Sequence, residues 1–538
     1  MELARTALAA TECSAMNSPV AEIVPGAKTI ICDGIPVTFI DCTPGELQAV
    51  CERLTSELGY SFATLVVEES RAVWRLGYIF YGDLDLQGGL VRVSVAISGE
   101  HPRVPSISAV VHAADWHERE AEDLFGLGFE GHPKLGDFIL HEHYPEGVNP
   151  MRSNFDATLY IPGKDICPWR PDRIVQASGA FAMPIGPVYS DFAESAHFLL
   201  ETVGEDVIRV IPRFFYKYRG IEKLAEGRKV EDVLLLAERF SGNSAFAHSL
   251  GFCQAVESVC DGEVPQRAQA LRMFFAELER FRYHVGVIAD ICGSTALAVA
   301  TSQAGILEEE LLRLSCRYGG HRYLFGLNVP GGLSKDLEDE ACRNLAAEAQ
   351  DVATRLCELQ EMLRFSSSFL DRIEEVGAIS KDDAMRYGLV GPIARASGVV
   401  RDLRITLPYG FYGKDAFSFS VPSEEEGDGY ARLRVFFREA MQAVGIMRQA
   451  AEALPAGPVR SERFALREGV SLGWSEAPCG AAFHWVRVGD GGRVARYRVT
   501  PPSFTNWHGF HLAAEDFAFQ DFPIIMATFG LSNAECDR

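Results

Sequence analysis

Long amphipathic stretches dominate the second half of the chain and limit the folds that it can adopt. In each of them apolar residues recur at three- and four-residue steps, which places them on one face of a helix. The stretches are VEDVLLLAERF (230–240), PQRAQALRMFFAELERFRYHVGVIAD (265–290), ILEEELLRLSCRYG (306–319) and LEDEACRNLAAEAQDVATRLCELQEMLRF (337–365). Helices of this length in series bury their apolar faces against one another, so the sequence predicts a helical bundle.

The first part of the chain has a different pattern, with short extended runs rich in Val, Ile, Tyr and Phe. The runs cover residues 29–42, 62–70, 73–82 and 90–98, and each predicts strand structure. The segment that follows the first run predicts a helix, with Thr43 as N-cap, Pro44 at the first helical position and Glu46 as the N3 partner. We expect a small mixed sheet with helices on one face.

The domain organisation follows from these two patterns. Residues 144–184 are irregular and rich in proline, which is typical of a connector, and residues 482–502 predict a β-hairpin that turns at Gly489 to Gly492. The predicted fold class is α+β, a small α/β domain followed by a large, mainly helical-bundle domain with a small β portion. The predicted parts are an N-terminal extension (1–30), the α/β domain (31–155), a connector (156–181) and the helical domain (182–538).

The charge balance and hydropathy exclude two classes of partner. The formal net charge is −23, and no basic arm or stripe offsets it, so nucleic acid is not an expected partner. A membrane span needs about 20 uninterrupted apolar residues. The closest segment, 284–302, carries Asp290 and Gly293 and is better explained as a buried helix with a break. Membrane association must therefore be indirect, through partners.

The cysteines exclude the simplest metal and redox motifs. The chain has 13 of them, and none stands in a C-x-x-C pair, which removes zinc ribbons, ferredoxin-type clusters and thioredoxin-like dithiols. The odd number and the poor secretory character of the N-terminus predict reduced thiols in the cytoplasm. No G-x-G-x-x-G motif follows a predicted strand, so NADH is not expected to bind this chain directly.

Residues 114–133, ADWHEREAEDLFGLGFEGHP, form a dense motif. Trp116, Arg119, Glu120 and Asp123 share one face of the predicted helix, which on its own indicates an exposed helix with ion pairs. The motif, however, resembles the W-x-E-R-E-x-x-D-L-F-G signature of the C subunit of respiratory complex I. That resemblance implies a helix that docks between protein subunits and has no catalytic role.

The second half carries further motifs from end to end, including YRGIEKLAE (218–226), VPQRAQALR (264–272), GLVGPIARASG (388–398), EAPCG (476–480) and PPSFTN (501–506). They resemble the D subunit of complex I and the large subunit of nickel-iron hydrogenases, above all the formate hydrogenlyase and hydrogenase-4 type in which both parts are fused in this order. The resemblance implies a peripheral-arm subunit of an NADH-quinone oxidoreductase or formate hydrogenlyase-like complex. Expected partners are a small iron-sulfur subunit like the B subunit of complex I, and membrane-arm subunits like its H subunit and the antiporters. Such a chain would lie in the cytoplasm, on the inner face of the cell membrane.

In hydrogenases of this family, four cysteine thiolates bind nickel and iron. The resemblance places their positions at Ser241, Ser244, Ser532 and Glu535 here, with Cys536 one residue beyond. Serine hydroxyls have pKa values far above neutrality and cannot replace soft thiolate donors. We therefore expect no nickel-iron centre and no cofactor bound by this chain, with the iron-sulfur cluster in the partner. The arginine that lies over the metal in relatives is Cys479 here.

In complex I, the D subunit helps to form a quinone pocket with histidines and a tyrosine. The resemblance places the histidine positions at Tyr189 and Ala193 and the tyrosine position at Gly242, so the usual donors are missing. Tyr189, His197 or Tyr218 are possible replacements. These residues are equally explained by structural hydrogen bonds.

A set of polar residues survives around the same expected cavity. Glu194 matches a glutamate on a proton route in hydrogenases, while Arg239, His248, Glu257 and His284 match positions that both relatives share. A buried carboxylate beside histidines can relay protons, because burial raises its pKa towards the working range. Glu194, His248 and Arg239 are the candidate relay residues.

Three functions remain open from the sequence. The first is a redox-complex subunit that couples electron transfer from the partner's cluster to proton or ion movement. The second is a non-catalytic scaffold or coupling subunit of the same assembly. The third is a quinone-reducing subunit with an altered pocket. The missing thiolates argue against an active hydrogenase.

Overall fold

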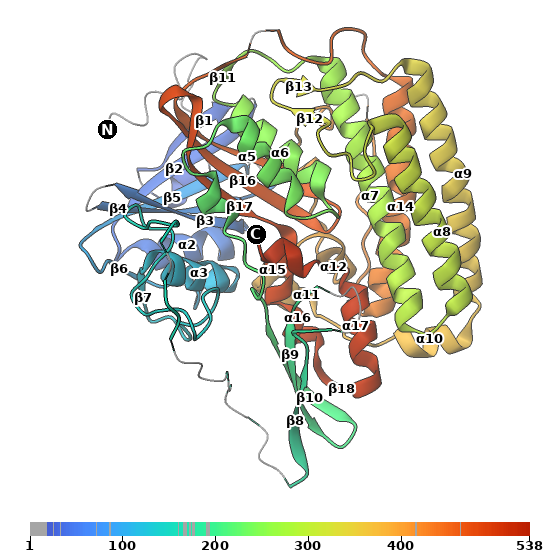
Figure 1. The fold of residues 1–538 in the computed structure, drawn as a ribbon, viewed down its shortest axis with the longest axis horizontal. Helices are drawn as coiled ribbons and strands as arrows, with labels where there is room; N and C mark the ends of the chain where they lie inside the picture. Colours follow the sequence, from blue (N-terminus) through green and yellow to red (C-terminus); the bar gives the residue numbers. More distant parts are fainter. Residues whose placement is uncertain are drawn as a thin grey trace.

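The computed structural model describes residues 19–24, 26–32, 34–70, 73–84, 88–159, 161–164, 169, 171, 174, 178–189, 194–414, 417–462 and 464–538. Much of the predicted extension (1–30) and of the predicted connector (156–181) lies outside these residues. The described chain contains both helices and strands, and the N-terminal sheet and the helical bundle occupy opposite sides of the molecule (Figure 1). This confirms the predicted α+β class.

The N-terminal sheet has five strands in the order β1-β2-β5-β4-β3. They are β1 (Lys28–Cys32), β2 (Ile35–Cys42), β3 (Ser61–Ser70), β4 (Val73–Tyr81) and β5 (Leu90–Ser98). Only β2 and β5 pair in parallel, so the sheet is mixed, as predicted. The run 29–42 contains two antiparallel strands, because Gly34 turns the chain with a φ of +82°.

Two helices, α2 (Leu47–Ser56) and α3 (Asp115–Phe125), pack against this sheet. The prediction that the first helix begins at Pro44 is wrong by one turn. Thr43 donates its backbone N–H to Glu46 Oε2 at 2.9 Å, but the regular helix starts only at Leu47. Glu46 thus closes the turn that precedes the helix.

The helical bundle consists of α7 (Gln266–Ser294), α8 (Ala298–Leu314), α9 (Asp339–Arg364) and α14 (Gly429–Glu452), which lie side by side (Figure 1). The first three match predicted stretches. α7 ends and α8 begins within the segment 284–302, and Ala296 between them has a φ of +60°. The predicted break is therefore present, and among the residues described here no helix is long and apolar enough to cross a membrane.

A three-stranded sheet lies between the N-terminal sheet and the bundle (Figure 1). It contains β15 (Gly469–Ala477), β16 (Gly480–Gly489) and β17 (Arg493–Thr500), of which the last two form the predicted hairpin. Helices α5 (Val230–Arg239) and α6 (Ala245–Glu257) pack beside it. A second sheet projects from the body, with β8 (Ala180–Ile185), β9 (His197–Val203), β10 (Asp206–Arg213) and β18 (Glu515–Ala518).

Short elements complete the described chain. The helices are α1 (Pro19–Ile23), α4 (Ile221–Ala225), α10 (Ser367–Ile373), α11 (Lys381–Arg386), α12 (Gly391–Ala396), α13 (Leu403–Thr406), α15 (Pro502–His508), α16 (Phe510–Ala513), α17 (Phe522–Phe529) and α18 (Asn533–Cys536). The strands are β6 (Arg103–Pro105), β7 (Gly128–Glu130), β11 (Cys260–Asp261), β12 (Asn328–Val329), β13 (Gly332–Leu333) and β14 (Ala465–Leu466).

Helix α3 joins the two domains through buried ion pairs. Glu120 is 2% exposed and pairs with Arg498 Nη1 at 2.6 Å and with Arg538 Nη2 at 2.8 Å. Arg498 also reaches Glu222 on α4 at 3.2 Å. The exposed helix that the charges alone indicated is therefore not what forms. Glu120 faces the larger domain, and Asp123 accepts from the backbone N–H groups of residues 138–140 within the N-terminal domain.

Candidate functional site

The four positions that correspond to metal ligands in hydrogenases meet in one buried place. Ser241 and Ser244 lie in the turn before α6, while Ser532 caps α18 and Glu535 lies within it. All four are at most 4% exposed. Ser241 Oγ lies 3.4 Å from Ser244 Oγ, the Ser244 hydroxyl donates to Glu535, and the Glu535 N–H donates to Ser532 Oγ at 3.2 Å. We call these four residues the Ser–Glu centre.

The Glu535 carboxylate accepts several of the hydrogen bonds around this centre. Its Oε1 accepts from Ser244 and from His248 Nε2 at 3.1 Å, and its Oε2 accepts from the Ser503 N–H at 3.0 Å. Cys479 Sγ lies 3.9 Å from the same Oε2. Burial alone would raise the pKa of Glu535, but the hydrogen bonds and the charge of His248 outweigh burial and lower it. Glu535 is therefore an ionised carboxylate at neutral pH.

A chain of fully buried hydrogen bonds leads from Glu535 into the three-stranded sheet. His248 Nδ1 lies 3.1 Å from His484 Nε2 on β16, and His484 Nδ1 lies 2.8 Å from the Tyr497 hydroxyl on β17. Burial and the charge of His248 hold the pKa of His484 well below its ordinary value, so its ring is neutral. The imidazole nitrogens and the hydroxyl in this chain of hydrogen bonds can each donate or accept. If every proton moves across one hydrogen bond, each donor becomes an acceptor and the direction of the hydrogen-bond chain is reversed.

This chain can therefore pass a proton, with one entering at one end and one leaving at the other. The sequence analysis did not single out His484 or Tyr497. The available signal was a histidine in an otherwise apolar run of the predicted hairpin, where β16 is buried without a break from Gly480 to Val486.

The close approach of His484 to α6 depends on a glycine. A Cβ at Gly251 would lie 2.8 Å from the His484 ring, whereas a Cβ at Gly445 on α14 would meet nothing within 4 Å. We expect Gly251→Ala to displace the ring and lower the free energy of unfolding by about 1–3 kcal/mol. Gly445→Ala should leave it unchanged or raise it by up to about 1 kcal/mol. Urea denaturation of both variants checks this, and equal stability would show that the ring does not pack as described.

Glu194 connects the Ser–Glu centre with the surface. Its side chain is exposed, and it accepts from the Ser532 hydroxyl at 3.0 Å and from the Ala534 N–H at 2.8 Å. Asn533 Nδ2 donates to the Glu194 carbonyl at 3.2 Å. Of the three predicted relay residues, Glu194 and His248 thus reach the centre from opposite sides.

Arg239, the third predicted relay residue, lies apart from these two. It is exposed, its Nε lies 3.4 Å from Glu238, and its guanidinium stacks 5.4 Å from the Phe325 ring. Gly242 lies close by, and a Cβ there would be 4.0 Å from the ring of Tyr323. The described contacts therefore place Arg239 among surface aromatic rings.

The remaining quinone-pocket positions make contacts of their own. The Tyr189 hydroxyl donates to the Ala196 carbonyl at 2.9 Å, and His197 Nδ1 lies 3.2 Å from the Tyr216 hydroxyl. Ala193 lies outside the described residues. None of the contacts described for Tyr189 or His197 involves the Ser–Glu centre.

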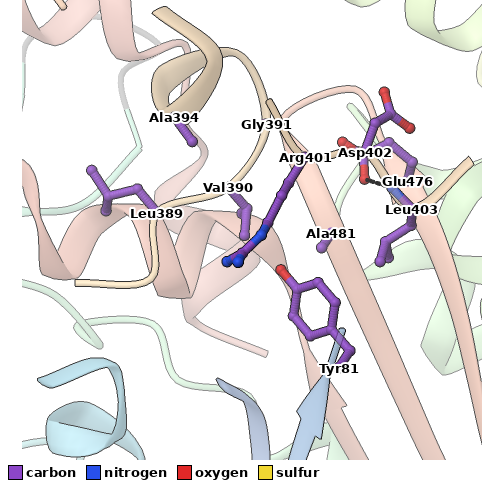
Figure 2. A pocket seen from close by; sticks show the side chains of 10 residues that line it. All are labelled: Tyr81, Leu389, Val390, Gly391, Ala394, Arg401, Asp402, Leu403, Glu476 and Ala481. Carbon is purple, nitrogen blue, oxygen red and sulfur yellow. Dashed lines mark hydrogen bonds between the residues drawn. The ribbon is translucent and has the colours of Figure 1, made fainter. Parts of the chain in front are cut away.

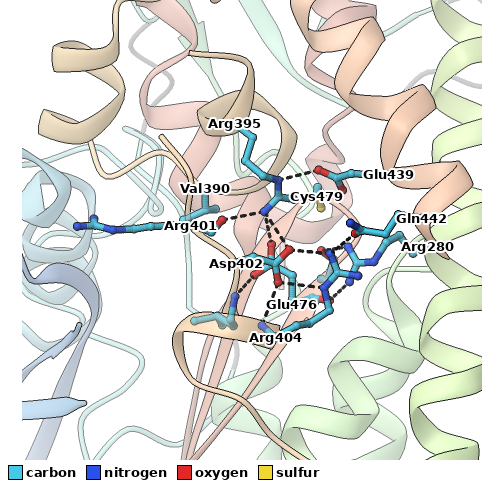
Figure 3. A network of polar contacts seen from close by, with 12 residues as sticks. Arg280, Val390, Arg395, Arg401, Asp402, Arg404, Glu439, Gln442, Glu476 and Cys479 are labelled. Carbon is cyan, nitrogen blue, oxygen red and sulfur yellow. Dashed lines mark hydrogen bonds and ion pairs between the residues drawn. The ribbon is translucent and has the colours of Figure 1, made fainter. Parts of the chain in front are cut away.

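A second buried polar cluster, which the sequence analysis missed, connects α7, α12, α13, α14 and β15 (Figure 3). His284 was predicted to matter, and it meets this cluster through Glu439 at 3.1 Å. Glu257, also predicted, pairs instead with Arg272 at 2.7 Å. We call the cluster the arginine–carboxylate network, and its members are the cations Arg280, Arg395 and Arg404 and the anions Glu277, Asp402, Glu439 and Glu476.

The donors of the Ser–Glu centre do not fit a nickel-iron site. The Ser244 and Ser532 hydroxyls are engaged by carboxylates. The thiol of Cys479 lies beside the centre, and burial and the charge of Glu535 raise its pKa well above the ordinary value. That thiol stays protonated and is a poor metal ligand. Among the described residues, no group of three or more His, Cys, Asp or Glu side chains is arranged to hold a metal ion.

Comparison with protein families places both domains. Residues 40–160 match the family described as the respiratory-chain NADH dehydrogenase 30 Kd subunit. Residues 306–468 match the family described as the 49 Kd subunit of the same enzyme.

Curated relatives match along most of the chain. Formate hydrogenlyase subunit 5 of Escherichia coli (strain K12) is 30% identical over 470 residues, which cover 86% of this chain and 82% of the relative. Hydrogenase-4 component G of the same organism is 28% identical, with 86% and 81% covered. The C/D subunit of NADH-quinone oxidoreductase from Gluconacetobacter diazotrophicus is 26% identical, with 97% and 96% covered.

A solved structure has the same fold. A chain of the membrane-bound sulfane sulfur reductase, an archaeal respiratory membrane complex, superposes with a TM-score of 0.63 at 24% identity. The match covers 68% of this chain and 100% of that chain.

Proposed function

Because this chain belongs to the family of fused 30 Kd and 49 Kd NADH dehydrogenase subunits that includes formate hydrogenlyase subunit 5, we propose that it is a peripheral-arm subunit of a membrane-associated oxidoreductase. In this proposal the chain couples electron transfer from a partner's iron-sulfur cluster to proton or ion movement, without a nickel-iron centre of its own. The partners are a small iron-sulfur subunit like the B subunit of complex I and membrane-arm subunits like its H subunit and the antiporters. They hold the chain at the inner face of the cell membrane.

The observation that carries the proposal is the line of polar contacts through the Ser–Glu centre. The exposed Glu194 accepts from the Ser532 hydroxyl, and the Ser532 oxygen accepts from the backbone N–H of Glu535. The Glu535 carboxylate contacts His248, and the hydrogen bonds continue through His484 to Tyr497. A charge that arrives near Glu535 changes the preferred proton position, because buried charges interact strongly. His248 and His484 then each pass a proton across one hydrogen bond to the next group. This step requires no metal ligand in this chain.

The two alternative functions, a scaffold subunit and a quinone-reducing subunit, assign other roles to these residues. A scaffold subunit would use these hydrogen bonds only to hold α6, α18 and the sheet together. A quinone-reducing subunit would need a free donor for each of the two quinone carbonyls. The Tyr189 hydroxyl is engaged by Ala196 and His197 Nδ1 by Tyr216, so that of these two side chains only His197 Nε2 lacks a partner among the described residues. We therefore favour proton coupling over quinone reduction by this chain.

The test is to replace the two relay residues in the native complex. Glu194→Gln and His248→Ala should each lower turnover by about 100-fold, the usual size of an acid–base contribution to a rate. Assembly, followed by the set of proteins recovered and by size-exclusion chromatography, should be unchanged. Glu309→Gln, an exposed carboxylate on α8, is the control and should leave turnover as it was. Unchanged turnover in both relay variants would favour the scaffold.

A further inference from the structure

The arginine–carboxylate network is buried. Each of its members is at most 4% exposed, although they come from five different elements. Arg395 bonds Glu439 at 2.7 Å and Glu476 at 2.9 Å, and Arg404 bonds Asp402 at 2.6 Å. The network therefore behaves as a single buried group of charges.

The charges of the network do not balance. It contains three guanidiniums and four carboxylates, so it carries one excess negative charge when every carboxylate is ionised. His284, which bonds Glu439, does not supply the missing positive charge, because burial lowers its pKa and keeps its ring neutral. An uncompensated charge in this position is strongly unfavourable. One additional proton restores the balance.

We propose that the arginine–carboxylate network is a proton-binding site that holds one exchangeable proton on Glu476. This inference rests on the proposed function, to which it adds a second proton-carrying site in the same domain. The proton converts one carboxylate into a neutral carboxylic acid and leaves three carboxylates facing three arginines.

Geometry and charge both select Glu476 as the carrier. Glu439 is bonded by Arg395 and by His284, and these contacts outweigh its burial and lower its pKa to about 2. Glu476 has a single guanidinium contact, to Arg395, and burial and the charge of Asp402 raise its pKa to about 7. Its Oε2 accepts from the Leu403 N–H at 3.0 Å. The other groups around Glu476 are Arg280, Arg401, Arg404, Tyr81 and Tyr409.

A small pocket provides access to this carboxyl. Asp402 and Glu476 line it from the network, and Tyr81 of β4 and Arg401 line it from the boundary with the N-terminal domain (Figure 2). The space open to the centre of a water molecule is about 10 Å³, enough for roughly one water. Arg401 also donates to the Gly59 carbonyl at 2.6 Å, so the pocket lies where the two domains touch.

Infrared difference spectroscopy of the full chain, titrated from low to high pH, tests the proposal. A protonated carboxylic acid absorbs separately from a carboxylate. We expect a buried carboxylic acid signal that disappears with a midpoint near 7 and is absent in Glu476→Gln. Glu118 and Glu279, which have pKa values raised to about 7 by burial, add similar signals. The assignment therefore rests on the difference between wild type and Glu476→Gln.

Glu257→Gln is the matched control, because Glu257 is paired with Arg272 outside the network. It should leave the Glu476 signal in place. A difference signal with a midpoint near the ordinary value of 4.5, or none, would overturn the proposal.

Stability provides a second readout that does not require turnover. The pKa of Glu476 in the folded chain is raised above its value in the unfolded chain. Its contribution to the free energy of unfolding is therefore fully present below pH 4.5 and is lost as the pH rises through about 7. Glutamine mimics the protonated acid. Over this window the unfolding constant of wild type should rise at least about tenfold relative to that of Glu476→Gln. A variant that fails to fold, or one with an unchanged ratio, would overturn the proposal.

The outcomes separate the two proposals. Both readouts use the resting chain, so their failure would leave the relay of Glu194 and His248 untouched. Loss of the relay function with an intact Glu476 signal would leave the proton-binding site standing.

Discussion

Replacing Arg395 by methionine is expected to lower the free energy of unfolding by about 3–5 kcal/mol, which is the usual cost of breaking a buried ion pair from one side. Arg395 is fully buried and donates to Glu439 at 2.7 Å, to Glu476 at 2.9 Å and to the Arg401 carbonyl at 2.9 Å. Methionine keeps much of the volume but no donor. The two carboxylates that lose their cation, Glu439 and Glu476, are at most 3% exposed.

Urea denaturation at neutral pH measures this effect, with the midpoint and the slope both reported. Arg313→Met is the control, because Arg313 is 71% exposed and pairs with Glu309 one turn away on α8. Its stability should be nearly unchanged. Similar losses in both variants would contradict the picture of a buried charge network that holds α12, α14 and β15 together.

The sequence predicted the helices whose buried and exposed faces differ in polarity. α9 shows this pattern over its whole length, and its predicted limits are within two residues of those observed. α14 was missed, because it is packed on several sides and buries Arg432 and Glu439 along with its apolar residues. A charge on a buried face cancels the periodic signal on which the prediction depends.

The candidate site was predictable only in part, for a related reason. The resemblance to known families assigned both Ser244 and Glu535 to metal-ligand positions of hydrogenases. These two residues are 291 positions apart in the sequence and hydrogen-bonded in the fold. No local pattern contains that information. The resemblance also selected Arg239, but residue identity does not reveal which way a side chain points, and this one lies at the surface.

The network around Glu476 shows the same limit more strongly. Its ion pairs join residues that are up to 127 positions apart, so the excess of one carboxylate becomes visible only when the chain is folded. The sequence does contain each charge, but only Glu277 and Arg280 lie in a stretch that predicts an amphipathic helix. What sequence reasoning lacked was the pairing of these charges.

The second large effect concerns metal content. We expect the native complex, purified through this chain, to contain no nickel in proportion to it. The Ser–Glu centre offers hydroxyls and one carboxylate where hydrogenases of the resembling type offer four thiolates, and hard oxygen donors of this kind do not hold a nickel-iron pair. The thiol of Cys479 stays protonated beside Glu535 and adds no thiolate.

Two precautions make the measurement decisive. The cells are grown with nickel supplied, so that a lack of nickel in the medium does not explain a low content. The complex is purified without chelators and on a tag that does not use a nickel column, so that nickel is neither removed nor added during purification. Iron is measured in the same sample, because the proposed iron-sulfur partner should contribute it. An iron signal without nickel then shows that metals survive the purification.

Elemental analysis of this complex, normalised to the amount of the chain, is the most direct test of the central claim that the buried centre holds protons in place of a metal. The account predicts iron from the partner and nickel far below one atom per chain. One nickel atom per chain would contradict it.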